Sequence, residues 1–312
     1  MPSTVHNLGS VNIDHVYRVP HLVRPGETLS SLALETVLGG KGANQSVALA
    51  RAGARVRHVG RVGEGDAWAR EALAGHGVDV SAVELVEGVS GHAIIQVDEG
   101  GENAIVLHGG ANSTLDAEAV ERGLADAREG DWLLMQNETS GVASAFDVAL
   151  RRGLRIAFNP APMSAAVGEL PLERCELLIL NETEAAMLAG EAGRDGDEAD
   201  VERALLQRCP DVGLVLTLGA RGSRFLHGET RVEVAAREVE VVDTTGAGDT
   251  FVGYLLAALV EGEQVRAATE RACAAAALSV TVAGATPSIP DAEAVADALA
   301  STSPTNAGSR GG

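Results

Sequence analysis

The segment DTTGAGDTF at positions 243–251 carries the strongest signal in the sequence. A short valine-rich run precedes it and an apolar helical run follows it, so Gly246, Ala247 and Gly248 fall where a helix begins. The first N–H groups of a helix have no intrahelical partner, and small residues let a ligand approach the backbone closely. Together with the helix dipole this predicts an anion cradle suited to phosphate. Asp249, in the first helical turn, is then placed to accept a proton from a hydroxyl nucleophile. A tight turn with a helix-stabilising Asp is the simpler alternative, but the complete segment is more specific than such a turn requires.

A second glycine-rich segment, GGKGANQ at positions 39–45, also leads into an expected helix. It contains Lys41, the only lysine among 24 basic residues. A compact ammonium at this one position indicates a place where a planar guanidinium does not fit. The segment is not a Walker A loop, because the GxxxxGK[ST] pattern is absent. It is typical of a polyol-binding turn in which backbone N–H groups, Lys41 and Asn44 donate to hydroxyls, and a plain glycine-rich helix cap is the alternative.

Short apolar runs alternate with alanine-rich helical stretches along the rest of the chain, which is the pattern of βα units. The expected strands are 4–8, 56–59, 132–136, 155–158, 177–180 and 214–218. The expected helices are 43–52, 67–76, 116–127, 144–152, 182–188, 198–208, 247–260, 265–280 and 291–299. The pattern predicts a large three-layer α/β domain with a central, mostly parallel sheet flanked by helices.

Two segments, 14–37 and 91–107, depart from this alternation. The second reads as a β-hairpin around a glycine-rich turn at 98–101. We expect both to form a small β-sheet lid over a site in a single domain spanning 1–300. Residues 301–312, mostly Ser, Thr, Pro and Gly, are expected to form a disordered tail. Exposed edges of such a lid also predict pairing between two copies of the chain, hence a homodimer.

Composition excludes several classes of protein. The 44 acidic and 24 basic residues give a net charge of −20, which disfavours nucleic-acid and membrane-surface partners. No long apolar window or basic leader is evident, so we expect a cytoplasmic protein. Cys175, Cys209 and Cys273 are too scattered to suggest disulfides or a metal site.

The two glycine-rich segments together resemble the two signatures of the ribokinase-like (phosphofructokinase-B) family of carbohydrate kinases. Further similarity to that family runs in order through GSVNIDH (9–15), PGET (25–28), NPAP (159–162), NETE (181–184), TLGARG (217–222) and GATPS (284–288), covering about 5–299. The resemblance implies ATP-dependent phosphorylation of a small sugar. The GGKGAN form of the first signature resembles that of the ribose-phosphorylating members, which implies transfer to O5 of D-ribose.

Residue roles follow from the same resemblance. Asp249 would be the general base, and the backbone of Gly246, Ala247 and Gly248 would hold the γ-phosphate. The sugar hydroxyls would be bound by Asn12, Asp14, Gly39, Gly40, Lys41, Gly42, Asn44, Glu138 and Asp249. The nucleotide would lie along Asn181, Thr217, Leu218, Gly219, Ala220, Arg221, Gly222, Gly248 and Cys273.

The family resemblance also implies two cations. Mg²⁺ would be ordered near Glu184, partly through water, although the residues alone also fit a capping box with Asn181. A monovalent cation, K⁺, would lie beside the anion cradle, although Asp243 also fits a turn-forming cap. The K⁺ positions are Asp243, Thr245, Ser279, Val282, Gly284 and Ser288.

Other functions stay open at this stage. His92 falls in the lid where a small apolar residue is expected, and it either faces the sugar or caps the strand. Another sugar or a nucleoside is therefore the main alternative substrate. A sugar- or nucleotide-binding regulator without turnover is disfavoured by the complete cradle and Asp249. A dinucleotide-dependent oxidoreductase is disfavoured because no GxGxxG follows the first strand.

Overall fold

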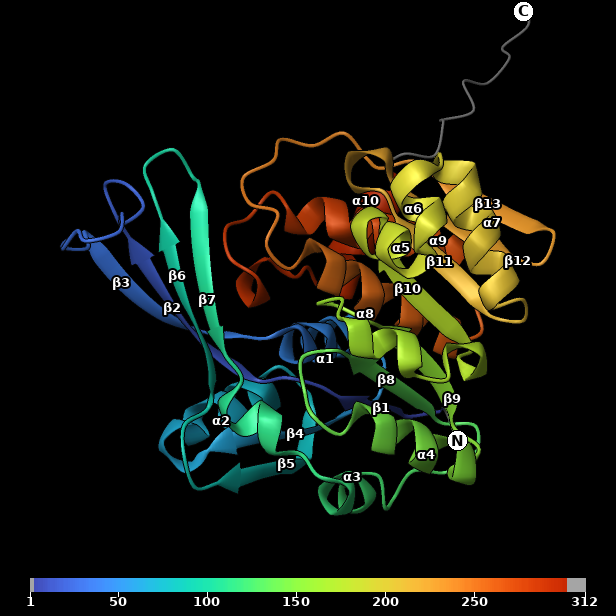
Figure 1. Ribbon diagram of the computed structural model, residues 1–312, viewed down its shortest axis with the longest axis horizontal. Helices are drawn as coiled ribbons and strands as arrows, with labels where there is room; N and C mark the ends of the chain where they lie inside the picture. Colours follow the sequence, from blue (N-terminus) through green and yellow to red (C-terminus); the bar gives the residue numbers. More distant parts are fainter. Residues whose placement is uncertain (1–2, 302–312) are drawn as a thin grey trace, which may run out of the picture.

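The computed structural model describes residues 3–301, which contain one large sheet and one small sheet (Figure 1). In spatial order, the large sheet contains β13 (Thr230–Val234), β12 (Ser223–His227), β11 (Gly213–Thr217), β10 (Leu177–Asn181), β9 (Arg155–Asn159), β8 (Trp132–Gln136), β1 (Val5–Leu8), β4 (Val56–Gly63) and β5 (Asp79–Val86). All strands from β11 to β5 pair in parallel, and β12 is antiparallel to both of its neighbours. The predicted mostly parallel sheet is confirmed.

Helices cover both faces of this sheet because its strands are apolar on both sides. In β8, Trp132 and Leu134 pack into one core cluster, whereas Leu133 and Met135 pack into the other. The first cluster includes residues of α1 (Lys41–Arg51), α2 (Ala67–Gly75), α8 (Ala247–Val260), α9 (Val265–Ser279) and α10 (Ala292–Ala300). The second includes residues of α3 (Ala117–Gly123), α4 (Val142–Arg152), α5 (Glu182–Ala189) and α7 (Glu198–Arg208). The short α6 (Glu191–Asp195) contacts α5 and α7. The predicted three layers are therefore present.

The small sheet, which we call the lid, stands away from the large one at one side of the molecule (Figure 1). Its strand order is β3 (Ala33–Gly39), β2 (Asn12–Arg18), β6 (Gly91–Val97) and β7 (Asn103–His108). β2 and β3 extend two residues beyond the expected 14–37 segment at each end. As a result Asn12 pairs with Gly39, and the lid is continuous with the glycine-rich segment that precedes α1.

Several elements differ from the sequence expectation. β5, β12 and β13 were not anticipated, because their polar side chains hide the strand pattern. Arg224 of β12 and Arg231 of β13 form ion pairs with the buried Glu202 of α7, which lets charged strands lie at the edge of the sheet. The helix expected over 116–127 ends at Gly123. The expected tail lies outside the described residues except for Ser301. Within residues 3–301, no helix has the length and apolar character needed to span a membrane.

Candidate active site

Most predicted site residues lie along one edge of the large sheet. The parallel strands β1, β8, β9, β10 and β11 all end there, at Leu8, Gln136, Asn159, Asn181 and Thr217. Ligands of open α/β sheets bind outside the carboxyl ends of the strands, because the loops that follow them and the helix N-termini converge there. The lid strands and the starts of α1, α5 and α8 meet the same edge.

The predicted sugar-binding residues are brought together where the lid joins α1. Gly39 is required here, because a Cβ at that position would lie 2.0 Å from the Oδ2 atom of Asp14. Gly42 similarly lies against Gly9, because a Cβ added at position 42 would lie 2.5 Å from the Cα atom of Gly9. Asn12 accepts a hydrogen bond at Oδ1 from Nδ2 of Asn112, at 2.7 Å. The close packing leaves the Asp14 carboxylate beside the glycine-rich segment.

Glu138, in the loop after β8, orders this region. Its Oε2 atom accepts hydrogen bonds from the Ser10 hydroxyl at 2.6 Å and the Lys41 backbone N–H at 3.0 Å. Its Oε1 atom lies 3.6 Å from the Lys41 ammonium. Burial, followed by repulsion from Glu138, raises the pKa of Asp14 to about 6, with Lys41 opposing the shift. The Oδ1 atom of Asp14 is buried and has no hydrogen-bond partner among residues 3–301, so it can accept a ligand hydroxyl.

Asp249 lies in the first turn of α8, below the predicted anion cradle. Gly246 caps this helix with a left-handed backbone (φ +76°), which favours glycine. The buried Asp249 carboxylate accepts hydrogen bonds from Asn44 Nδ2 at 3.0 Å and Gln45 Nε2 at 2.9 Å. Burial raises the pKa of Asp249, while Lys41, Gln45 and Asn44 oppose that rise. The first glycine-rich segment and the second are thus joined at one carboxylate.

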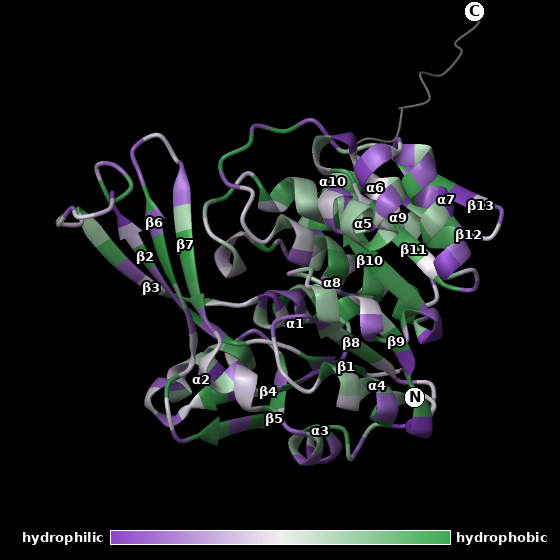
Figure 2. Cartoon of the chain, viewed as in Figure 1, coloured by the Kyte–Doolittle hydropathy of each residue, from purple (hydrophilic) through white to green (hydrophobic). Residues whose placement is uncertain are grey.

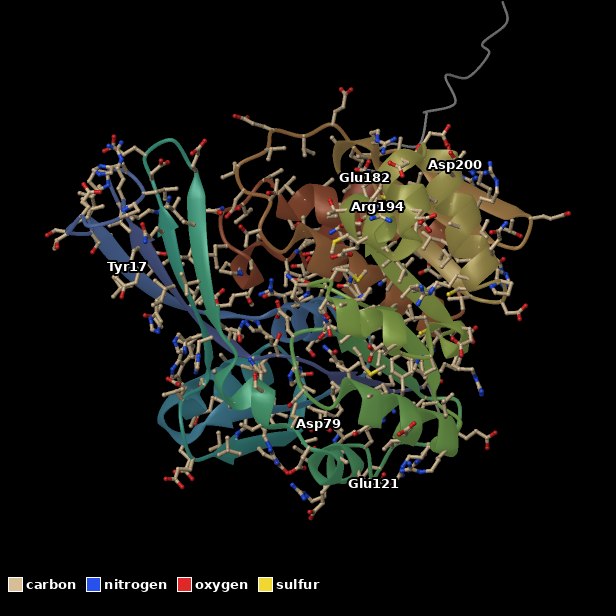
Figure 3. The ribbon with its side chains drawn as sticks, in the orientation of Figure 1. Tyr17, Asp79, Glu121, Glu182, Arg194 and Asp200 are labelled. Atoms are coloured by element: carbon tan, nitrogen blue, oxygen red, sulfur yellow. The ribbon has the colours of Figure 1, made fainter. Side chains whose placement is uncertain are left out.

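A cavity of about 690 Å³ begins at the cradle and runs past β10 and β11. The predicted nucleotide residues in its wall are Asn181, Thr217, Gly219, Ala220, Gly222, Gly248 and Cys273. Leu218 and Arg221 are not in the wall. Leu218 packs in the core, and Arg221 forms ion pairs with Glu182 and Glu198 instead. Glu182, labelled in Figure 3, does line the cavity at the start of α5.

Sequence reasoning missed part of this wall. The irregular segment 236–241 supplies Ala236, Arg237, Glu238, Val239 and Val241. Val241 is 60% exposed, which is unusual for a valine and is explained by its place in an open cavity. Phe251 of α8 and the small residues Ala276 and Ala277 of α9 complete the apolar side. The available signal for this part of the wall was the group of valines at 239, 241 and 242, which directly precedes the glycine-rich segment 243–251.

The predicted K⁺ residues come from two segments that lie against each other. The backbone N–H groups of Val242 and Asp243 donate to the carbonyl of Val280, and the Gly284 N–H donates to Asp243 Oδ2 at 2.8 Å. Thr245 donates to Asp243 Oδ1 from both its backbone and its hydroxyl. Although burial opposes the change, these hydrogen bonds lower the pKa of Asp243. The hydroxyls of Ser279 and Ser288 donate to backbone carbonyls, and Val282 is exposed. Any cation here would therefore be held mainly by backbone carbonyl oxygens.

Glu184 and Asn181 form a complete capping box at the start of α5. The Asn181 side chain accepts from the Glu184 N–H at 2.8 Å, and Glu184 Oε2 accepts from the Asn181 N–H at 2.9 Å. Burial raises the pKa of Glu184. No group of three or more His, Cys, Asp or Glu side chains within the described chain forms a metal-binding cluster. The residues present therefore fit Mg²⁺ only through Glu184, water and ligand phosphates.

The position of His92 corrects its interpretation as a possible sugar contact. In the β2–β6 pairing, His92 lies beside Ile13 and Ala93 lies beside Asp14. Because neighbouring residues of a strand point to opposite faces, Ala93 shares the face of Asp14 and His92 does not. His92 instead lines a separate hollow of about 390 Å³ with His15 and Asp66. Ala93, a small apolar residue, occupies the face of the lid that carries Asp14.

Comparison with known proteins assigns the class. Residues 3–292 match the pfkB family carbohydrate kinase model, and the chain belongs to this family. The protein is thus a phosphotransferase that acts on a hydroxyl group. Among characterised relatives, the chain is 39% identical to the ribokinase of Haemophilus influenzae over 296 residues, covering 93% of this chain and 96% of that one. It is 33% identical to the deoxyribokinase of Salmonella typhimurium over 298 residues, covering 92% and 95%.

Solved structures agree with this assignment. The ribokinase of Cryptococcus neoformans in complex with ADP has a TM-score of 0.83 and 36% identity, covering 95% of this chain and 99% of that one. The ribokinase of Arabidopsis thaliana complexed with ribose and ATP has a TM-score of 0.84 and 30% identity, covering 96% and 99%. The predicted fold and family are both confirmed.

Proposed function

We propose that this protein transfers the γ-phosphoryl group of ATP to O5 of D-ribose. The observation that carries the proposal is the place of Asp249. Its carboxylate accepts a hydrogen bond from Asn44 of the glycine-rich segment 39–45, while its neighbour Gly248 lines the large cavity. A hydroxyl bound near Lys41 and a phosphate bound at the start of α8 therefore meet at this carboxylate. The ribokinase relatives, including the one complexed with ribose and ATP, support ribose and ATP as the substrates.

The proposed reaction is a direct phosphoryl transfer. Asp249 takes the proton from the sugar hydroxyl while the oxygen of that hydroxyl forms a bond to the γ-phosphorus. The bond between this phosphorus and the β–γ bridging oxygen breaks, and ADP is released. The N–H groups at the start of α8 stabilise the negative charge that develops on the transferred phosphoryl group. Asp14 and Glu138 accept hydrogen bonds from the remaining hydroxyls, and Lys41 and Asn44 donate to them. The lid limits access of water, so that ATP is not hydrolysed.

Two cations belong to the proposal. Mg²⁺, bound through the phosphates and by water to Glu184, would offset the charge of the triphosphate in a protein of net charge −20. K⁺ would be held by carbonyl oxygens of the segments around Asp243 and Gly284, next to the cradle at Gly246. The contacts between these two segments, through Val280 and Gly284, support a shared site.

We also infer that the lid pairs with the lid of a second copy. Every residue of β7 is exposed, including Ile105 (53%), Val106 (67%) and Leu107 (57%). Figure 2 shows hydrophobic stretches on the lid strands, mixed with hydrophilic ones and away from the main core. Exposed apolar residues on a sheet with two open edges favour association. The expected cytoplasmic location stays a prediction.

The decisive experiment measures ADP release with ATP and Mg²⁺, offering D-ribose with and without K⁺. K⁺-stimulated turnover at sub-millimolar ribose is expected. 2-Deoxyribose, other pentoses, ketohexoses and nucleosides form the comparison panel, because a deoxyribokinase is also among the relatives. Preference for another acceptor over ribose would contradict the proposed substrate but not the family. ³¹P and ¹³C NMR of the product would identify the phosphorylated oxygen.

A further inference from the structure

Gln45 of α1 is the last residue of the glycine-rich segment 39–45, and its buried side chain has no role in the reaction proposed above. It is fully buried, and its Nε2 atom lies 2.9 Å from Asp249 Oδ1 and 3.1 Å from Asn159 Oδ1. Its Oε1 atom accepts a hydrogen bond from Nε2 of Gln136, at 2.7 Å. The amide is therefore held at both ends, between α1, β8, β9 and α8.

The orientation of this amide is fixed by chemistry. An ionised carboxylate only accepts hydrogen bonds, so Gln45 must present its NH₂ group to Asp249. Its oxygen then faces Gln136, which must present its own NH₂ group, because that nitrogen also donates to Asn7 Oδ1 at 3.0 Å. The Asn7 amide is oriented in turn, since its Nδ2 donates to the Gly42 carbonyl and the Ser46 hydroxyl, both at 2.8 Å. Reversing Gln45 would set oxygen against oxygen at one end and NH₂ against NH₂ at the other.

The relay Asn7–Gln136–Gln45 is maintained at a cost. The Oε1 atom of Gln136 is buried and has no hydrogen-bond partner within residues 3–301. An unsatisfied buried oxygen destabilises the folded state, so an arrangement that keeps one indicates a gain elsewhere. The compensating interaction is the hydrogen bond that the last member of the relay, Gln45, donates to Asp249.

The Oδ2 atom of Asp249 also accepts a hydrogen bond from an amide whose orientation is fixed. Asn44 donates to Oδ2, and the Asn44 oxygen is fixed because it accepts from the Thr286 hydroxyl at 2.8 Å. The charged groups that act on Asp249 are Lys41 of α1, which favours ionisation, and Glu138 of the β8 loop, which opposes it. Burial raises the pKa of Asp249 most strongly, and Gln45 and Asn44 oppose that rise together with Lys41.

We propose that Gln45 is a positioning residue that, through its fixed orientation, holds Asp249 as an ionised and oriented acceptor for the hydroxyl proton. This inference rests on the proposed role of Asp249 as general base. When Asp249 takes the proton, the acid keeps two donors facing it that cannot turn, so the protonated form is disfavoured and the proton returns readily to solvent. Gln45 acts through Asp249 and does not touch the substrate.

The test replaces Gln45 with methionine, which has a similar length and no amide. In Gln45→Met we expect the acid limb of the pH profile of kcat/KM to move up by about one to two pH units, because a hydrogen bond that favours the ionised form is lost. Infrared difference spectra of the free protein, with an Asp249→Asn background for assignment, should show the Asp249 carboxyl titrating at a correspondingly higher pH. Thr269→Val is the matched control: Thr269 of α9 is buried and its hydroxyl donates to the Val265 carbonyl at 2.7 Å, with no hydrogen bond to Asp249 or to the relay. Its acid limb should stay at the wild-type position.

Lower turnover of Gln45→Met with an unmoved acid limb and an unmoved infrared titration would overturn the proposal and leave Gln45 a packing residue. If the wild-type protein phosphorylates no sugar, the proposed function fails, while the infrared titration still decides whether Gln45 holds the carboxylate. If Gln45→Met does not fold, Gln136→Met tests the same relay by releasing the Gln45 oxygen. An upward shift there supports the proposal, and a wild-type profile there contradicts it.

Discussion

Asp14 and Asp249 are both carboxylates in the field of Lys41, yet their surroundings give them different tasks. Both oxygens of Asp249 accept hydrogen bonds from fixed amides, whereas the Oδ1 atom of Asp14 has no partner in the described chain. In the proposed function, Asp249 is therefore oriented before the sugar binds, whereas the unpartnered oxygen of Asp14 accepts a hydrogen bond from a sugar hydroxyl. Two variants separate these tasks.

Asp249→Asn should remove the base while keeping the shape of the side chain, with the loss of one of its two hydrogen bonds to Asn44 and Gln45. We expect kcat to fall by about 10²- to 10⁴-fold, the usual contribution of a general base, with sugar affinity changed only several-fold. Steady-state kinetics and calorimetric titration with the sugar measure the two effects separately. Near-normal turnover would remove Asp249 from the role of base.

Asp14→Asn should stabilise the unliganded protein while weakening sugar binding. The folded-state pKa of Asp14, about 6, lies above its ordinary value of 3.8, because burial and Glu138 disfavour the ionised form. Between these two values the folded state binds more protons than the unfolded state, so stability falls as pH rises through this window. Above pH 6 the ionised group destabilises the fold by at most about 3 kcal/mol, which the variant relieves.

Thermal unfolding measures this effect. Asp14→Asn should raise the Tm at pH 7.5 and have little effect at pH 4, and it should raise the KM for the sugar at pH 7.5. Asp147→Asn, on the exposed face of α4, is the control and should leave the Tm unchanged at both values of pH. An equal gain in Tm at pH 4 and pH 7.5 would contradict the assigned cause.

At the scale of elements, the site depends on helix beginnings. α1, α5 and α8 all start at the carboxyl edge of the sheet. The N-termini are of two kinds. Glycine is the N-cap residue of α1 and α8, whereas α5 begins with the Asn181–Glu184 capping box. The first N–H groups of α1 donate to Glu138 and Ser10, and the capping box of α5 uses its own N–H groups. At α8 the N–H groups of Gly248 and Asp249 have no hydrogen-bond partner within residues 3–301, which leaves them free for a ligand.

Glu184→Gln tests whether that capping box also serves Mg²⁺. Gln supports a capping box as well as Glu does, so the Tm should change little. Loss of the negative charge should raise the Mg²⁺ concentration for half-maximal activity several-fold. Asp200→Asn is a matched control, because Asp200 holds the same position in the capping box of α7 (Figure 3). An unchanged Mg²⁺ requirement in Glu184→Gln would leave Glu184 a purely structural residue.

At the scale of the whole molecule, the lid is the part whose apolar surface has no cover within the described chain. Neither edge strand, β3 nor β7, pairs on its outer side within residues 3–301. Pairing of two lids would bury these strands and stiffen a sheet that also supplies Asn12 and Asp14 to the site. Association and sugar binding are then expected to support each other.

Light scattering after size exclusion should give a mass of twice 32.0 kDa for the wild type. Ile105→Asp and Val106→Asp alter opposite faces of β7, and the one that yields a monomer identifies the face that pairs. Leu150→Asp, at an exposed position of α4, should leave the mass unchanged. A monomeric wild type at micromolar concentration would contradict the proposed pairing.

The amino-acid sequence by itself determined the class of fold, the family and most of the residues near the site. Strand runs that are apolar on both faces require helices on both sides, and the glycine-rich segment that leads into α8 predicts ligand-accessible N–H groups. These are local consequences of side-chain pattern and backbone freedom. They needed no knowledge of which strands are neighbours.

Only the tertiary structure decided which side chains meet. The strand register assigned Ala93 to the face of Asp14 and His92 to the other face, because a shift of one residue reverses every side chain of a strand. Packing paired Arg221 with Glu182 and Glu198, and Arg221 does not itself line the cavity. It also joined Gln45 to Asp249, residues 204 positions apart, through a relay that starts in β1. Hydrogen bonds between distant segments depend on how strands and helices pack, and no local pattern in the sequence encodes them.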